Sequence, residues 1–253
     1  NRDVGSKGFG GHGAMVRRPG AGGRTLSSPV ELPWPTSTAP RRQRPPMTIF
    51  LIRHGETALN AARVLQPPDT PLSLRGLAQA EALARRLAAL RPAAVLSSDQ
   101  PRAARTAEVI ASACRLTVRP SELLRERHFG EWRGRAYDDL PADALHSEAP
   151  PPGGESGTAF RARVDAGFAQ ILQRHAALAG SGPLVVVSHG LVIWDLLARH
   201  LDRAGAPMPT HLGNTSLTVF AARAPHAVRL LACTRHLEGE TAVSDDPRAL
   251  CGG

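Results

Sequence analysis

The sequence predicts an α/β protein, built as a three-layer α/β/α sandwich around a largely parallel sheet. Three observations lead to this class. Short apolar, β-branched runs alternate with longer segments of helical periodicity, the pattern of parallel strands joined by helices. One run, "PLVVVSHG", is the most convincing central strand of the chain. With 253 residues, the chain is long enough for a sizeable core in one domain of about 200 residues.

Each element follows from a local pattern. Ser73 is expected to cap a helix that stops before Pro92, and Pro101 suits the first turn of the next helix. The other expected helices are a long one at about 158–178 and one in "LVIWDLLARHL", and the helix from Pro101 runs to about Ala113. The expected strands, in chain order, cover 48–52, 94–97, 116–118, the run in "PLVVVSHG", 215–221 and 228–233.

The chain is expected to divide into three parts. Residues 1–46 contain eight Gly and seven Pro without periodicity, so we expect a disordered extension. Position 1 is not Met, whereas Met47 stands directly before the first strand pattern, which favours 1–46 as an upstream extension. We assign 47–236 to a single domain and 237–253 to a C-terminal tail.

The charge of the chain is uneven. Its formal net charge is +9, but residues 1–46 hold eight basic and two acidic residues, and the rest holds 23 basic and 20 acidic residues. The basic residues of the domain are dispersed and not grouped with aromatic residues. The domain therefore lacks the charge pattern of a nucleic-acid-binding protein.

The cysteine count and hydropathy bear on location. Cys114, Cys233 and Cys251 have no metal-ligand spacing, and an odd, sparse count fits a reducing compartment. No run approaches the ~18 apolar residues of a membrane span, and no apolar segment follows Arg17-Arg18 as a secretory signal requires. We expect a cytoplasmic protein without a membrane span. An Arg/Ser-rich, acid-poor N-terminus leaves a transit peptide as the alternative.

Reactive side chains follow three of the predicted strands, in "IRHG", "LSSDQPR" and "VVSHG". In α/β sheets, sites form at the carboxyl ends of strands. His54 and His189 each precede a glycine, which permits a tight turn and close approach of a ligand. Arg53 and Arg102 have planar forks that match phosphate oxygens. A lone histidine at a strand end is more often a hydrogen-bonded structural group, but this combination predicts a phosphate site.

The same motifs resemble those of the histidine phosphatase superfamily, also called the phosphoglycerate mutase-like family. "LIRHGETALN" is similar to the family signature, and "LSSDQPRAARTAE" to its second phosphate-binding segment. "LRERHFGEWRG" resembles the segment of the catalytic acid, "VVVSHG" that of the second histidine, and "GGES" a further block. The resemblance covers roughly Met47 to Leu231, with the motifs in family order. It implies a phosphoglycerate mutase-like fold and a histidine phosphatase catalytic domain at 47–236.

The resemblance also implies roles for single residues. His54 would attack phosphorus and form a phosphohistidine, while Glu126 would act as general acid and base and His189 would stabilise charge. No cofactor and no metal is called for. The implied substrate-binding residues are Arg53, Asn60, Gln66, Arg102 and Gly190.

Three points stay open at this level. Glu131 is a rival to Glu126, although the alignment of "LRERHFG" favours Glu126. His128 is equally compatible with the pocket and with the surface. The family glutamine at the position of Gln66 usually precedes a glycine, whereas here Pro67-Pro68 follow, so this loop is expected to differ in shape.

The leading prediction is a metal-independent phosphomonoesterase that acts on a small phosphorylated metabolite. The interval from Glu126 to His189 lacks the long insertion of cofactor-dependent phosphoglycerate mutases, which favours hydrolysis. The alternatives are a phosphoglycerate mutase-type isomerase and a non-catalytic protein that binds phosphorylated ligands. Sugar phosphates, a nucleotide-loop phosphate of cobamide synthesis and phosphohistidines of proteins all fit the chemistry, and the sequence leaves the oligomeric state open.

Overall fold

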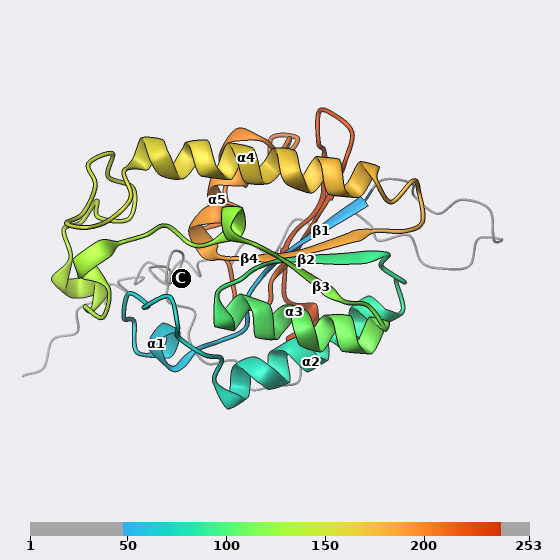
Figure 1. The fold of residues 1–253 in the computed structure, drawn as a ribbon, viewed down its shortest axis with the longest axis horizontal. Coiled ribbons are helices and arrows are strands. Elements are labelled where there is room, and N and C mark those ends of the chain that lie inside the picture. Colours follow the sequence, from blue (N-terminus) through green and yellow to red (C-terminus); the bar gives the residue numbers. More distant parts are fainter. Residues whose placement is uncertain (1–47, 239–253) are drawn as a thin grey trace, which may run out of the picture.

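The computed structural model describes residues 48–238, which form an α/β sandwich of three layers (Figure 1). The predicted extension at 1–46 and most of the predicted tail at 237–253 lie outside the described residues. Within them, six strands form one sheet in the order β3-β2-β4-β1-β5-β6. The strands are β1 (Thr48–Arg53), β2 (Ala94–Ser98), β3 (Val118–Ser121), β4 (Leu184–Ser188), β5 (Leu217–Ala221) and β6 (Val228–Cys233).

Two helices cover each face of the sheet. In Figure 1, α2 and α3 lie below the sheet, and α4 and α5 lie above it. The α-helices are α1 (Ala58–Ala61), α2 (Leu74–Ala88), α3 (Pro101–Cys114), α4 (Gly157–Ala176) and α5 (Gly190–Arg199). Short 3-10 turns, which the sequence did not predict, are η1 (Glu122–Leu124), η2 (Gly130–Trp132), η3 (Tyr137–Asp139) and η4 (Arg235–Leu237).

The sheet is largely parallel, as predicted. Strand β1 pairs parallel with β4, β4 with β2, and β2 with β3. Strand β5 runs antiparallel to β1 and β6 antiparallel to β5. The carboxyl ends of β1, β2 and β4 therefore lie at the same end of the sheet, which is the end nearer to α1 in Figure 1.

The core lies on both faces of the sheet, which explains the uninterrupted apolar runs of the strands. In β1, the buried Ile49 and Leu51 belong to the cluster under α4 and α5. The buried Phe50 and Ile52 belong to the cluster under α2 and α3. Because successive side chains of a strand point to opposite faces, a strand covered on both sides needs apolar residues at every position.

The predicted helix starts are confirmed. The hydroxyl of Ser73 accepts a hydrogen bond from the Gly76 N–H at 3.0 Å and caps α2. Pro101 occupies the first turn of α3, where its missing N–H removes no intrahelical bond.

The third strand was misplaced by the sequence prediction. The first two residues of the expected strand at 116–118 lie outside any strand and follow the end of α3, where Arg115 is left-handed and the Leu116 N–H donates to the Ala111 carbonyl at 2.8 Å. The observed β3 starts at Val118 and includes Pro120. Proline is tolerated there because β3 lies at the edge of the sheet, where one side of the strand needs no ladder donor.

Candidate active site

The site begins at the end of β1, where the chain turns sharply after His54. A side chain on Gly55 would place its Cβ 2.5 Å from the Gly76 carbonyl oxygen, and one on Gly76 would lie 2.0 Å from the Glu56 carbonyl oxygen. Both positions therefore require glycine for space. The amide N–H of Gly55 donates to the Thr106 hydroxyl at 3.0 Å, which ties the turn to α3.

His54 is held as a neutral imidazole with a defined tautomer. It is fully buried, and its Nδ1 lies 2.7 Å from the Gly55 carbonyl oxygen. A carbonyl only accepts, so Nδ1 carries the proton and Nε2 holds the lone pair. Burial, followed by the charges of Arg102 and Arg53, lowers the pKa of His54 well below its ordinary value. His54 is therefore available as a nucleophile at neutral pH.

The second histidine stands at the end of β4. His189 is fully buried, and the centre of its ring lies 5.1 Å from that of His54. Its Nε2 is 2.8 Å from the Ser98 hydroxyl oxygen at the end of β2. When Ser98 donates to Nε2, Nδ1 carries the proton of His189 and can donate it to a ligand. Gly190 is the first residue of α5 and is also buried.

Two buried arginines lie close enough to the histidines for their charges to lower the pKa values of both. Arg53 and Arg102 are each 1% exposed. Arg53 donates from Nη1 to the Leu212 carbonyl. Arg102 donates from Nη2 to Oε1 of Gln100 at 2.8 Å. Burial is also the main reason why the pKa of Arg102 falls to about 10, so this arginine stays cationic at neutral pH.

The loop that departs from the family pattern contacts Arg102 directly. Nη1 of Arg102 lies 3.3 Å from the Pro67 carbonyl oxygen and 3.4 Å from that of Pro68. The expectation that the two prolines shape this loop can thus be made specific: their carbonyl oxygens help to orient the guanidinium.

Glu126 is the buried carboxyl group of the site, 3% exposed. Its Oε1 accepts from the Arg127 N–H at 3.1 Å and its Oε2 from the Leu191 N–H at 3.0 Å, near the start of α5. Burial raises the pKa of Glu126 and outweighs these two hydrogen bonds and the nearby arginines, which lower it. A buried carboxyl group of this kind is suited to proton transfer.

The two predicted neutral donors sit beside the turn. Gln66 is 4% exposed, and its Oε1 accepts from the Thr57 hydroxyl at 2.9 Å. Asn60 forms a capping box with Thr57 at the start of α1, and its Oδ1 also accepts from Asn214 Nδ2 at 3.2 Å. Both residues therefore hold the turn in place, in addition to any contact with a ligand.

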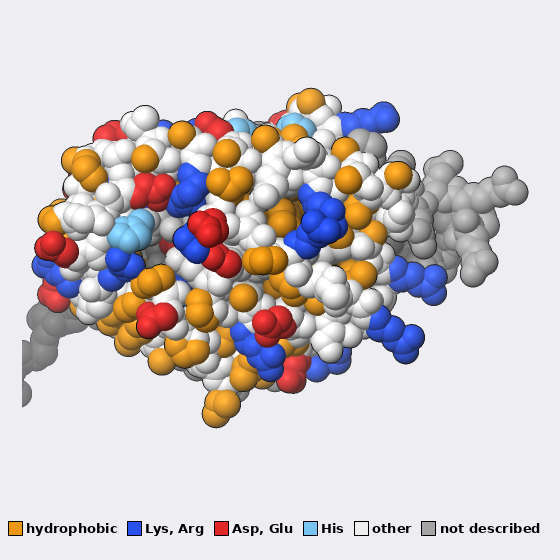
Figure 2. All heavy atoms as spheres, in the orientation of Figure 1, with side chains coloured by type: hydrophobic (Ala, Val, Ile, Leu, Met, Phe, Trp, Pro, Cys, Tyr) orange, Lys and Arg blue, Asp and Glu red, His pale blue; other side chains and the backbone are white. Residues whose placement is uncertain are grey.

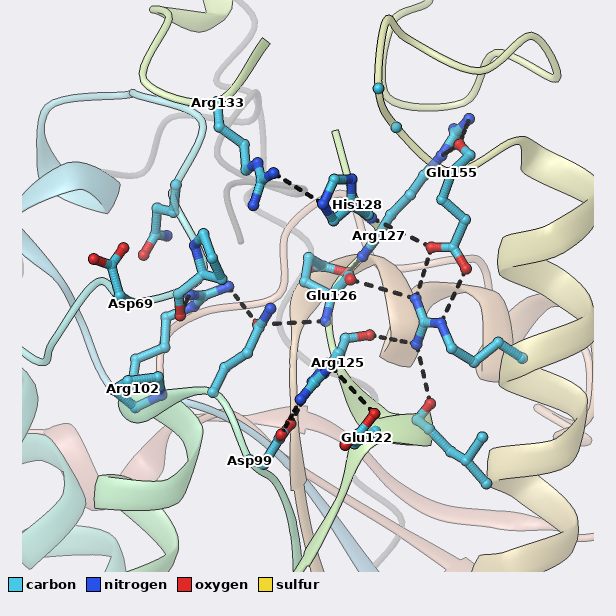
Figure 3. A pocket seen from close by; sticks show the side chains of 18 residues that line it. Asp69, Asp99, Arg102, Glu122, Arg125, Glu126, Arg127, His128, Arg133 and Glu155 are labelled. Atoms are coloured by element: carbon cyan, nitrogen blue, oxygen red, sulfur yellow. Dashed lines mark hydrogen bonds and ion pairs between the residues drawn. The ribbon is translucent and has the colours of Figure 1, made fainter. Parts of the chain in front are cut away.

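A pocket of about 790 Å³ opens in front of these residues (Figure 3). Gln66, Arg102 and Glu126 line it, whereas the two histidines are fully buried and do not line it. Figure 2 shows that charged side chains of both signs are spread over the face of the molecule drawn there. The arrangement provides an inner chamber of nitrogen donors and an outer space for the rest of a ligand.

Comparison with known proteins identifies the family. The family model described as histidine phosphatase superfamily (branch 1) matches residues 49–232. The chain belongs to this superfamily.

Similar proteins of the superfamily are enzymes of two kinds. A probable phosphoglycerate mutase, GpmB of Yersinia pestis, is 36% identical over 183 residues, which cover 68% of this chain and 83% of that protein. The mycobacterial glucosyl-3-phosphoglycerate phosphatase solved with VO3 is 31% identical with a TM-score of 0.59, covering 69% of this chain and 91% of that one. A mutant phosphoserine phosphatase from Entamoeba histolytica, solved with phosphoserine, is 28% identical with a TM-score of 0.59. The match covers 75% of this chain and 98% of that one. The chain is therefore an enzyme of the histidine phosphatase and phosphoglycerate mutase-like type.

Three residues near the site were not singled out from the sequence. Ser98 contacts His189, Gln100 bonds Arg102, and the Thr106 hydroxyl joins the Gly55 N–H to the Arg102 carbonyl, to which it donates at 2.7 Å. All three lie in "SSDQPRAART", whose similarity to a superfamily phosphate-binding segment was the available signal.

Two features are absent from the described residues. Between residues 48 and 238, no three His, Cys, Asp or Glu side chains are grouped so that they could hold a metal ion. In the same range, no helix is both long and apolar enough to cross a membrane.

Proposed function

We propose that this enzyme is a metal-independent phosphomonoesterase that hydrolyses a small phosphorylated metabolite through a phosphohistidine on His54. One observation carries the proposal. In the part of the chain that the structure describes, Nε2 of His54, Nδ1 of His189 and Nε of Arg102 are buried without a hydrogen-bond partner. Buried polar atoms are rarely left unpaired without a reason. A phosphoryl group gives Nε2 an electrophile and gives the other two nitrogens oxygens to which they can donate.

In the first step, the lone pair on Nε2 of His54 forms a bond to phosphorus while the bond from phosphorus to the ester oxygen breaks. The neutral state of His54 makes this lone pair available. Glu126 gives its proton to the departing alkoxide, because it lies both in the buried site and on the wall of the pocket that would hold the leaving group.

In the second step, water attacks the phosphohistidine from the side that the alcohol has left. The Glu126 carboxylate takes a proton from the water, an oxygen–phosphorus bond forms, and the phosphorus–nitrogen bond returns its electrons to Nε2. Inorganic phosphate leaves, and both residues regain their starting protonation states.

Charge on the phosphoryl oxygens is stabilised by Arg53, Arg102 and the Nδ1–H of His189, with Asn60 and Gln66 as neutral donors. Preorganised donors in a buried site supply most of the catalysis in phosphoryl transfer. These cationic and neutral donors take the place that a metal ion has in other phosphoryl-transfer enzymes, which is why we propose a metal-independent reaction.

Hydrolysis is favoured over isomerisation. The pocket beside Glu126 is wide enough to admit water together with a substrate, and the chain between Glu126 and His189 lacks a long insertion that would enclose the phosphoenzyme. Both solved structures described above are named phosphatases. The similarity to a probable phosphoglycerate mutase keeps phosphotransfer within phosphoglycerate as the second candidate. We place the enzyme in the cytoplasm, in keeping with the unpaired Cys114 and Cys233.

The test is direct detection of the intermediate. After brief mixing with ³²P-labelled substrate and rapid quenching, the wild-type enzyme should carry acid-labile, base-stable phosphate, and turnover should resist EDTA and be inhibited by vanadate. The His54→Ala variant should keep its fold and lose both the label and turnover, because the nucleophile sits on a turn and its removal takes no residue from the apolar core. Full activity of His54→Ala would contradict the mechanism.

A further inference from the structure

The outer part of the pocket contains an arginine that no carboxylate among residues 48–238 neutralises. Five arginines line the pocket: Arg102, which belongs to the candidate phosphate site, and Arg125, Arg127, Arg133 and Arg163. Three of the last four have extensive partners. Arg125 pairs with Asp99 and Glu122, and Arg163 pairs with Glu155 at 2.8 Å. Arg127 donates to the main-chain oxygens of Leu145, Ser147 and Glu155. The remaining one is Arg133.

Arg133 has only weak partners among the described residues. Its Nε donates to the Gly130 carbonyl at 3.0 Å, and its Nη2 lies 2.8 Å from Nε2 of His128. No carboxylate of the described chain lies within ion-pair distance of it. Figure 3 shows Arg133 and His128 pointing toward each other in the upper part of the view, with Arg102 below them at the left and Glu126 near the centre.

The hydrogen bonds of His128 conflict with each other. Its Nδ1 is placed to accept from the Gly130 N–H at 3.2 Å, and its Nε2 to accept from Arg133 at 2.8 Å. A neutral imidazole has only one accepting nitrogen, and a protonated one has none. Burial and the charge of Arg133 lower the pKa of His128, which favours the neutral ring. One of the two contacts must therefore be unfavourable in the free enzyme.

An anion between the two side chains would remove this conflict. Nδ1 of His128 would accept from the Gly130 N–H, Nε2 would carry the proton and donate it to an oxyanion, and Arg133 would donate to the same oxyanion. The nearby Glu155 is already neutralised by Arg163, and Asp69 is exposed on another part of the pocket wall. His54 and His189, which would hold the scissile phosphate, are fully buried and do not line the pocket, whereas Arg133 and His128 do, so this pair is left for another anion.

We propose that Arg133 and His128 form a second anion-binding site, which binds a carboxylate or a second phosphate of the substrate while the scissile phosphate lies at His54. The substrate is then a small phosphomonoester with a further acidic group. This inference rests on the proposed function for the location of the scissile phosphate.

The experiment compares matched substrates. 3-Phosphoglycerate and glycerol 3-phosphate differ by a carboxylate, and fructose 1,6-bisphosphate and fructose 6-phosphate differ by a phosphate. The wild-type enzyme should prefer the more anionic member of at least one pair, and which pair it is identifies the anion. The Arg133→Gln variant should lower that preference about tenfold or more, mainly through KM. The Arg133→Lys variant should keep an intermediate preference, because it retains the charge but not the fork.

The matched control is Arg135→Gln, which removes an exposed arginine two residues away that does not line the pocket. It should leave the preference at the wild-type value. The second site is overturned if Arg133→Gln loses the same activity toward both substrates of a pair, or if the wild type does not prefer the more anionic substrate of either pair. Both outcomes leave the phosphatase proposal in place. If the wild type hydrolyses no phosphomonoester, the proposed function fails, and calorimetric binding of the same pairs to wild type and Arg133→Gln then decides the anion site separately.

Discussion

Burial acts on His54 and Glu126 in opposite directions, and both directions suit the proposed chemistry. It lowers the pKa of the histidine and raises that of the carboxyl group, because the charged form of each loses hydration. Both shifts therefore favour a neutral nucleophile and a protonated acid in the same site. In water the ordinary pKa values of the two groups leave the acid ionised wherever the histidine is neutral.

The role of Glu126 predicts a dependence on the leaving group. Glu126→Gln keeps the shape of the side chain but cannot donate the proton. It should cost on the order of 10²-fold or more in kcat/KM with an alkyl phosphate, whose alkoxide needs protonation. With p-nitrophenyl phosphate the transfer to His54 should suffer much less, seen as a surviving burst of p-nitrophenolate. Steady-state turnover should still be slow, because the same carboxylate activates water.

The rival carboxylate supplies the control for that experiment. Glu131 is exposed in η2 and is not part of the pocket wall. Glu131→Gln should change neither the alkyl phosphate rate nor the burst. If the leaving-group dependence appears in Glu131→Gln and is missing from Glu126→Gln, the acid has been assigned to the wrong residue.

At the level of elements, the turn after β1 is set by its contact with the start of α2. Glu56 is the connecting residue. Its carbonyl accepts from the Ser73 N–H at 2.9 Å, its own N–H donates to Gln79 Oε1 at 2.9 Å, and its carboxylate accepts from the Ser73 hydroxyl at 3.1 Å. These bonds bring the backbone of α2 so close to the turn that only glycine fits at the contact. The position of His54 is thus coupled to the position of α2.

Gly76→Ala tests this coupling. Its Cβ would lie 2.0 Å from the Glu56 carbonyl oxygen, so α2 or the turn must move. We expect a loss of roughly 1–3 kcal/mol in stability, typical of overpacking, and a fall in kcat/KM because His54 shifts. Thermal unfolding and steady-state kinetics measure the two effects.

Gly167→Ala in α4 is the matched control, because its Cβ would lie 3.2 Å from the Leu123 carbonyl oxygen, a tight contact that a small shift of the neighbouring backbone relieves. Alanine is the better helix former by about 1 kcal/mol, so this variant should keep both its stability and its activity. If Gly76→Ala behaves like Gly167→Ala, the turn is not held by α2 in the way described.

The sequence predicted those elements whose signals are local. His54 and His189 were found because each stands between an apolar strand and a glycine, and Arg102 because it lies at a helix start after such a strand. Ser98 and Thr106 were missed because their roles are contacts to other segments, which depend on the strand order and on the packing of α3. The extent of β3 through Pro120 was missed for a similar reason, since the edge position that tolerates a proline is a property of the sheet and not of the segment.

For the molecule as a whole, the site is part of the interior. Its arginines, histidines and Glu126 are as buried as the apolar residues of the two clusters that flank the sheet. Protonation in the site is therefore linked to the stability of the entire described domain, and not to a surface loop alone.

This linkage predicts how stability changes with pH. The pKa values of His54 and His189 lie well below their ordinary value of 6.5 in the folded protein, and that of His236 falls to about 4. As the pH falls below 6.5, the unfolded chain binds protons at these histidines that the native state does not bind. The free energy of unfolding should therefore fall from about pH 7 to about pH 5. Glu126 has the opposite effect on stability. Because its pKa is raised in the folded protein, the native state binds this proton at a higher pH than the unfolded chain does as the pH falls.

Urea unfolding across this pH range, without phosphate in the buffer, measures the slope. His54→Ala should make the slope shallower by about one proton, because it removes one buried neutral histidine. Glu126→Gln should make it steeper, since the opposing proton uptake is lost. The two variants thus change the slope in opposite directions although they lie in the same site, which a general loosening of the structure cannot produce. An unchanged slope in His54→Ala would mean that His54 is not held neutral in the folded enzyme, and the proposed nucleophile would then be protonated in the pH range where it must act.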